Sequence, residues 1–198
     1  MKRLVLLEGK NDLHFLRCVF LNSGRNPSAE LDEYINEGTK REKSTEETQK
    51  LRRYIKNSKF NVLAKVEIGK QNQRRLFREN CLNFASDLYI TVIFDLDKSP
   101  MDKNIRERIE ELRSKNPTLK FMIKKTSPMV FGSHRVDFVV SKMFGRKSRK
   151  LFLFSFFTFE DSLESTAKKT CPYFENPLDG IGELSKHFKV SDLFPSDL

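Results

Sequence analysis

The chain has 198 residues, of which 38% are hydrophobic and 32% charged, a balance that excludes a disordered chain and a large multidomain machine. Its 37 Lys and Arg residues against 27 Asp and Glu residues give a formal net charge of +10, which favours nucleic acid, a phosphorylated ligand or an anionic membrane surface as partner. The three cysteines lie far apart, so the sequence predicts neither a disulfide framework nor a cysteine zinc site. No run approaches the roughly 18 apolar residues of a membrane span, and we expect a cytoplasmic protein with no membrane partner.

The chain begins with a predicted strand and helix. Residues 4–7 form a continuous apolar run, which is typical of a strand covered on both faces of a sheet. Apolar residues then recur at helical spacing over residues 13–21, and Asn11 or Asp12 is placed to cap this helix.

Further strands alternate with helices up to residue 125. Residues 61–68, 88–94 and 120–124 predict three more strands, and helices are expected after the first two of them. Alternation of this kind is typical of a parallel sheet with helical crossovers. The fold class is therefore predicted as α/β, with a parallel sheet of about four strands covered by helices.

Two segments are predicted to lie outside this core of residues 1–125. Residues 27–59 are polar and highly charged, and we interpret them as an insertion after the first helix that contains a helix over residues 44–57. Residues 126–198 are interpreted as a C-terminal extension packed on the core, in which residues 135–144 fit either a helix or a strand. The extension also predicts a strand over 150–157 and helices over 162–169 and 181–188. Its phenylalanines favour a core position over a base-stacking platform, at 152, 154, 156, 157 and 159.

Carboxylates follow the ends of the predicted strands. Glu8 follows the first strand, and Asp95 and Asp97 follow the strand over 88–94. In a parallel sheet these ends meet at one edge, and two aspartates at i and i+2 on an extended segment point to the same side. Asp12, in the first turn of the first helix, is placed to project into the same space. Because converging carboxylates repel one another and oxygen ligands suit Mg²⁺ or Mn²⁺, this pattern predicts a magnesium or manganese site.

These residues resemble the Toprim domain found in topoisomerases, DnaG-type primases, OLD-family nucleases, a ribosomal-RNA maturation nuclease and small archaeal Toprim-like proteins. The Toprim signature is a strand followed by Glu-Gly, a second strand ending in Gly, and a third ending in Asp-x-Asp. The matching residues here are Glu8-Gly9, Gly69 and Asp95-Leu96-Asp97, and Asp12 matches the Glu-Gly-x-x-Asp pattern of the nuclease branches. The likeness covers about residues 3–125. The 198 residues hold no Gly-x-x-x-x-Gly-Lys-Ser/Thr motif, so we expect a free-standing Toprim-like protein without the ATPase of OLD nucleases.

The resemblance implies metal-dependent phosphoryl transfer on DNA or RNA, most simply as a nuclease. It implies catalytic roles for Glu8, Asp95 and Asp97 and metal ligation by Glu8, Asp12, Asp95 and Asp97. We predict contacts with the nucleic acid from Lys10, Gly69, Arg74, Arg75 and Arg78, because the arginines open a helix beside the expected site. The alternative function is a non-catalytic nucleic-acid or nucleotide-binding module, or a subunit completed by a partner protein or a second copy of the chain.

Several residues keep two interpretations. Glu8 is either a catalytic carboxylate or a solvated strand end, and Asp12 is either a metal ligand or a helix cap. Glu160 and Asp161 follow a predicted strand and are either late metal ligands or ordinary helix-start acids. The arginines at 74, 75 and 78 are either phosphate contacts or a solvated basic face.

Overall fold

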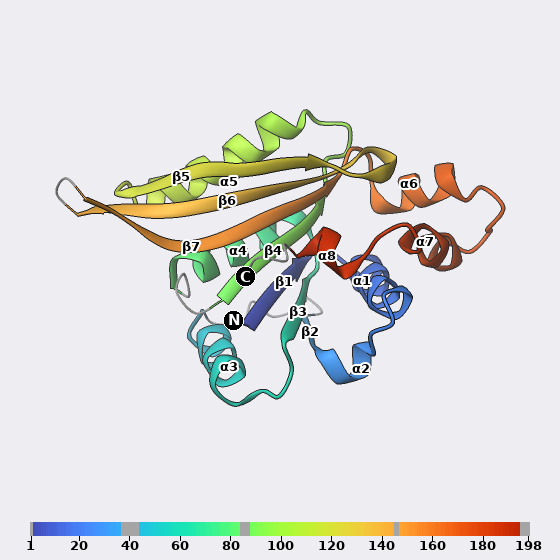
Figure 1. Ribbon diagram of the computed structural model, residues 1–198, viewed down its shortest axis with the longest axis horizontal. Coiled ribbons are helices and arrows are strands. Elements are labelled where there is room, and N and C mark those ends of the chain that lie inside the picture. The colour runs from blue at the N-terminus through green and yellow to red at the C-terminus, as the bar shows by residue number, and fades with distance from the viewer. Residues whose placement is uncertain (1, 37–43, 84–87, 145–146, 195–198) are drawn as a thin grey trace.

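The computed structural model describes residues 2–36, 44–83, 88–144 and 147–194. Over these ranges it confirms the α/β class and shows a sheet of seven strands, which is larger than predicted (Figure 1). The strands are β1 (Lys2–Leu7), β2 (Leu31–Asn36), β3 (Val62–Glu67), β4 (Leu88–Asp95), β5 (Leu119–Pro128), β6 (Ser133–Phe144) and β7 (Lys147–Phe159).

The sheet has a parallel half and an antiparallel half. Its strand order is β2-β3-β1-β4-β7-β6-β5, and the first five strands in this order run parallel to one another. β6 and β5 pair antiparallel at the opposite edge. The prediction of a parallel sheet of about four strands is therefore wrong in size, and the sheet is mixed because β6 runs opposite to its neighbours β5 and β7. The predicted strand over 120–124 is part of β5, and short connections turn the chain back from β5 to β6 and from β6 to β7, where parallel strands would need a long crossover.

Helices cover both faces of the sheet. The structure has α1 (Lys10–Asn22), α2 (Pro27–Glu30), α3 (Ser44–Asn57), α4 (Lys70–Asn83), α5 (Met101–Lys115), a 3₁₀ turn η1 (Val130–Gly132), α6 (Leu163–Thr170), α7 (Pro177–Ser185) and α8 (Val190–Leu193). α3, α4 and α5 pack on the face that carries Leu4 and Leu6, whereas α1, α6, α7 and α8 pack on the face that carries Val5 and Leu7. All four of these strand residues are fully buried, which explains the continuous apolar run in the sequence.

The segment predicted as an insertion is partly built into the sheet. The predicted helix over 44–57 is confirmed as α3, but the same segment also holds β2, which was not predicted and which pairs with β3 at the sheet edge. Residues 37–43 of the predicted insertion lie outside the described residues.

The C-terminal part of the chain completes the sheet. Residues 135–144, for which helix and strand both remained open, belong to β6, and the predicted strand over 150–157 lies within β7, beside β4. The predicted core position of the phenylalanines in β7 is confirmed, since all five are at most 5% exposed; they are Phe152, Phe154, Phe156, Phe157 and Phe159. The boundary drawn at residue 125 falls inside β5. Within the described ranges, no helix is long and apolar enough to cross a membrane.

Candidate functional site

Three strand ends meet at one edge of the parallel half of the sheet. Glu8 directly follows β1, Asp95 is the last residue of β4, and Gly69 follows β3. Gly69 has a φ of +95°, which an L side chain rarely adopts, and its amide donates to the Glu8 carbonyl at 3.3 Å. The tight turn after β3 therefore needs glycine and lies against the end of β1.

The Glu8 carboxyl is largely buried beside a buried arginine. Its side chain is 14% exposed, and its Oε1 lies 3.8 Å from Nη2 of Arg108. Burial raises the pKa of Glu8 to about 7, and the positive charges of Lys70 and Arg108 only partly offset this. Oε1 accepts no hydrogen bond from any described residue, although it is buried. Glu8 is therefore not a solvated strand end.

Arg108 lies beside Glu8, Gln73 holds Arg108, and sequence reasoning missed both. The Arg108 guanidinium in α5 lies over the Phe94 ring at 3.9 Å, and it donates to Oε1 of Gln73 in α4 at 3.4 Å. Burial lowers the pKa of Arg108 to about 10. A signal was present in the sequence, because Arg108 interrupts the apolar stripe of α5, and a polar side chain at such a position must find buried partners.

The Gln73 side chain also bridges two strands. Its Nε2 donates to the carbonyl of Leu6 in β1 at 3.2 Å and to the carbonyl of Ile93 in β4 at 2.6 Å. Gln73 is fully buried, so these bonds satisfy its amide in the absence of water.

Asp12 holds the start of α1 and lies close to the other carboxylates. Its Oδ2 accepts hydrogen bonds from the amides of Glu8 at 2.8 Å and Gly9 at 3.0 Å. Gly9, rather than Asn11 or Asp12, occupies the N-cap, and Asp12 is the third helical residue. Burial, followed by the charges of Asp95 and Glu8, raises the pKa of Asp12 well above its ordinary value. Both interpretations of Asp12, as a helix-start residue and as a member of the carboxylate group, therefore retain support.

Asp95 connects the end of β4 to α6. Its Oδ1 accepts a hydrogen bond from the amide of Leu163 at 3.0 Å. Burial, followed by the charge of Glu164, raises the pKa of Asp95 to about 7. Glu164 was not predicted, and its Oε1 accepts from Nδ2 of Asn11 in α1 at 2.6 Å. A fourth carboxylate thus approaches the site from the C-terminal part of the chain.

The two predicted late acids lie at the margin of this group. Glu160 is exposed, and Asp161 forms an ion pair with Lys169 at 2.9 Å, which lowers the pKa of Asp161. Asp161 still contributes to the raised pKa of Asp95.

Asp97 lies in a turn beyond the end of β4. The strand ends at Asp95, and both Asp97 and Lys98 have left-handed backbones, with φ values of 46° and 64°. The Asp97 side chain is 56% exposed and pairs with Lys70, whose amino group also donates to the carbonyl of Asp95 at 3.3 Å. The expected i and i+2 geometry fails because the chain turns immediately after β4, and Asp97 lies at the rim.

The predicted basic contacts differ in their intramolecular partners. In α4, Arg74 pairs with Glu111 at 2.6 Å, and Arg75 pairs with Glu79 at 2.9 Å. Arg78 is partly exposed and pairs with none of the described carboxylates. Lys10 is exposed at the start of α1. Arg78 is therefore the arginine of α4 that can contact a phosphate without breaking an ion pair to a described carboxylate.

The oxygen donors fit Mg²⁺ through a small number of direct bonds. Within the described parts of the chain, no three His, Cys, Asp or Glu side chains are arranged to hold a metal ion as they stand. Mg²⁺, however, is commonly held by one or two carboxylates together with water and substrate phosphates. Glu8 and Asp95, both largely buried and one with an unsatisfied oxygen, meet that smaller requirement.

Comparison of the chain with known proteins found no matching family model, no matching curated protein and no matching solved structure. The function of the chain must therefore be inferred from the chemistry of its site.

Proposed function

We propose that this protein carries out metal-dependent phosphoryl transfer on nucleic acid, most simply as a nuclease of the Toprim type. The observation that supports the proposal is the group of mostly buried carboxyls at the ends of β1 and β4 in a chain of net charge +10. Two of them, Glu8 and Asp95, have a pKa of about 7. Such values suit groups that exchange a proton or bind a cation near neutral pH.

In this proposal each residue of the site has a separate role. Asp95 would bind Mg²⁺ or Mn²⁺, which would supply positive charge at the scissile phosphate, whereas Asp97 would stay paired with Lys70 at the rim. Glu8 would accept or donate the proton, held in place by Arg108. Asp12 would fix the turn between β1 and α1 that carries Glu8.

The Toprim resemblance supports the same assignment. Its Glu-Gly, Gly and Asp-x-Asp motifs fall at Glu8, Gly69 and Asp95, at the ends of β1, β3 and β4. These strands are neighbours in the sheet, in the order β3-β1-β4.

The test is a cleavage panel with labelled single-stranded and duplex DNA and RNA in Mg²⁺, Mn²⁺ or EDTA. We expect cleavage of at least one substrate in a divalent metal and none in EDTA. The Glu8→Gln variant should lose this cleavage, because an amide can neither take up nor release the proton. Cleavage at the wild-type rate in Glu8→Gln would contradict the assignment.

A non-catalytic nucleic-acid-binding module is the second candidate. It is favoured by the absence of a three-ligand metal cluster among the described side chains. This function predicts binding that weakens steeply with salt and no turnover in any divalent metal. The same panel, run beside a binding assay, separates the two functions.

Arg78 offers a prediction that holds for both functions. Arg78→Ala should weaken nucleic-acid binding similarly for all sequences and reduce the slope of log affinity against log salt by about one unit, because one phosphate contact is lost. Arg74→Ala should change the slope much less, since Glu111 and Glu107 already neutralise Arg74. The measurement is fluorescence anisotropy of a labelled oligonucleotide over a salt series. Equal slopes for wild type and Arg78→Ala would show that Arg78 contacts no phosphate and belongs to a solvated basic face.

A further inference from the structure

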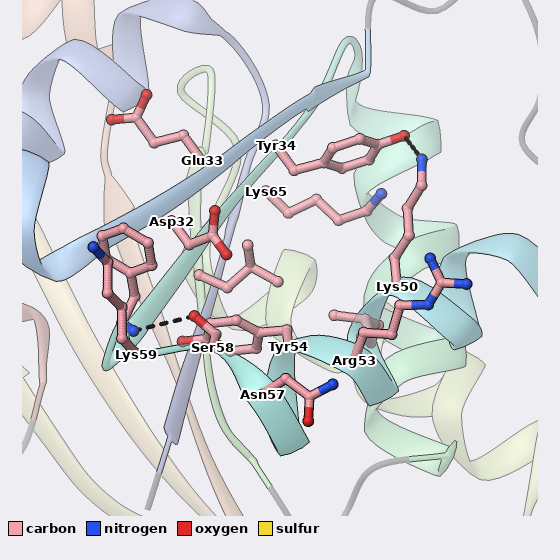
Figure 2. Close-up of a pocket in the computed structure, with 13 residues that line it drawn as sticks. Asp32, Glu33, Tyr34, Lys50, Arg53, Tyr54, Asn57, Ser58, Lys59 and Lys65 are labelled. Atoms are coloured by element: carbon pink, nitrogen blue, oxygen red, sulfur yellow. Dashed lines mark hydrogen bonds between the residues drawn. The ribbon is translucent and has the colours of Figure 1, made fainter.

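The segment predicted as an insertion builds a second concave surface, away from the carboxylate site. It lies between β2, β3 and α3 (Figure 2) and has a volume of about 540 Å³. This volume falls within the usual range for small-molecule sites. Nothing in the proposed phosphoryl transfer uses this pocket.

The inner wall of the pocket is apolar and fixed in place. Leu51, Tyr54 and Leu63 are each at most 7% exposed. The Tyr54 hydroxyl donates to the carbonyl of Arg3 at 3.3 Å, and the Lys2 ammonium donates to the carbonyls of Tyr54 and Ser58 at 2.7 Å each. These bonds tie the end of α3 to β1, so the wall needs little ordering when a ligand enters.

Two ammonium groups flank the aromatic ring of Tyr34 in β2. Lys50 Nζ lies 4.2 Å and Lys65 Nζ lies 4.3 Å from the ring centroid. Lys50 also donates to the Tyr34 hydroxyl at 2.7 Å, as Figure 2 shows. Lys65 is buried and pairs with Glu67 at 2.9 Å. Positive charge is therefore concentrated beside an aromatic surface.

The lining of the pocket carries more positive than negative charge. Of the described residues that line it, four are cations, Lys50, Arg53, Lys59 and Lys65, and two are carboxylates, Asp32 and Glu33. Glu33 is held by both Arg17 Nε and Arg17 Nη2, and Arg17 does not line the pocket. The cations on α3 and its C-terminal end thus favour an anionic ligand.

We propose that this pocket binds one nucleotide unit, with the base against the apolar and aromatic wall and the phosphate at Lys50 and Arg53, which lie on the same side of the pocket in Figure 2. An aromatic surface combined with cations is the combination that holds an unpaired base and its phosphate in single-strand binding proteins. The unit is either a free mononucleotide or an unpaired nucleotide of a strand, and the two share this chemistry. The proposal is independent of cleavage at Glu8 and Asp95.

Tyrosine NMR tests the location of binding, because the chain has four tyrosines and no tryptophan. Ring signals of ¹³C-labelled Tyr are followed during titration with adenosine 5′-monophosphate, adenosine, inorganic phosphate or a short oligoadenylate. The monophosphate and the oligoadenylate should shift Tyr34 and Tyr54. Tyr89, which is buried, and Tyr173, which is 91% exposed and does not line the pocket, should stay unchanged. If the oligoadenylate binds more tightly than the monophosphate, the natural ligand is an unpaired nucleotide of a strand. If the two bind with equal affinity, the natural ligand is a free mononucleotide.

A pair of charge-reversal variants on one segment supplies the control. Arg53→Glu with Lys59→Glu should weaken binding of the monophosphate at least about tenfold, because both cations line the pocket. Arg52→Glu with Lys56→Glu makes the same change in net charge at exposed positions of α3 outside the pocket, and affinity should stay within about twofold. An unchanged Tyr89 signal reports that each variant is folded. The proposal would be overturned if both double variants lost the same affinity for the monophosphate. It would also be overturned if inorganic phosphate alone shifted the Tyr34 and Tyr54 signals equally, or if millimolar nucleotide did not shift them.

Discussion

Asp95→Asn is expected to stabilise the metal-free protein at pH 8 by about 2–4 kcal/mol and to lower metal-dependent cleavage by about a hundredfold or more. The stabilisation follows from burial, because the folded state holds the Asp95 carboxyl away from water and close to Glu164. Asparagine keeps the acceptor for the Leu163 amide and carries no charge. Cleavage should fall because asparagine is a much weaker ligand for a divalent cation than a carboxylate.

The pH dependence has a definite sign. The pKa of Asp95 is about 7 in the folded protein against an ordinary value of 3.8, so the folded state keeps a proton that the unfolded chain releases. Wild-type stability should therefore fall as pH rises from about 4 to 7, and the advantage of Asp95→Asn should vanish near pH 4. The measurement is thermal melting of both proteins in EDTA across this range.

Asp97→Asn is the matched control, because it removes the same charge at an exposed site. Its free energy of unfolding should stay within about 0.5 kcal/mol of wild type. Mg²⁺ should raise the melting temperature of wild type and Asp97→Asn, but not of Asp95→Asn, at matched ionic strength. Equal effects of the two substitutions on stability would show that Asp95 is not in a buried, charge-disfavouring position.

Arg108→Met is expected to destabilise the protein by about 3 kcal/mol at pH 8.5 and by less than about 1 kcal/mol at pH 5. Methionine can pack on Phe94, but it leaves the Glu8 carboxylate without its buried cation. In the wild type the positive charge of Arg108 lowers the pKa of Glu8, so the loss of Arg108 should raise this pKa above its wild-type value of about 7. Glu8 stays protonated at pH 5, so the cost appears only as pH rises.

Arg106→Met supplies the comparison on the same helix. Arg106 is exposed, and its loss should change stability by less than about 0.5 kcal/mol at either pH. Chemical denaturation at the two pH values measures both variants. A loss for Arg108→Met that is the same at pH 5 and pH 8.5 would show that Glu8 does not depend on Arg108 for its charge.

The parallel core was predictable because its strands are covered on both faces. The sequences of β1 and β4 are nearly continuous apolar runs; a carboxylate directly follows β1 and another ends β4, which located Glu8 and Asp95. β2 was missed because it is an edge strand with polar residues such as Asp32 and Glu33, so it lacks this pattern. β6 was ambiguous because it carries Arg135 and Asp137 in the interior, where they pair at 3.2 Å.

The supporting residues of the site were less predictable for a different reason. Arg108, Gln73 and Glu164 approach Glu8 and Asp95 from helices that follow other strands, and their spacing in sequence carries no information about these contacts. Local pattern reveals that a polar residue faces the core, but only tertiary structure reveals its partner. The turn after Asp95 was also hidden, since the residues at 96–98 give no glycine to mark the left-handed backbone.

The side-chain amide of Gln73 acts as a spacer between two neighbouring strands. The pairing of β1 with β4 ends at Leu6 and Val92, although both strands continue. Where this pairing ends, the Gln73 amide donates hydrogen bonds to the carbonyls of Leu6 and Ile93. β1 and β4 are therefore free to diverge just before Glu8 and Asp95. Changing this one neutral side chain is therefore expected to alter how β1 and β4 separate just before these carboxylates, while the surrounding loops keep their length.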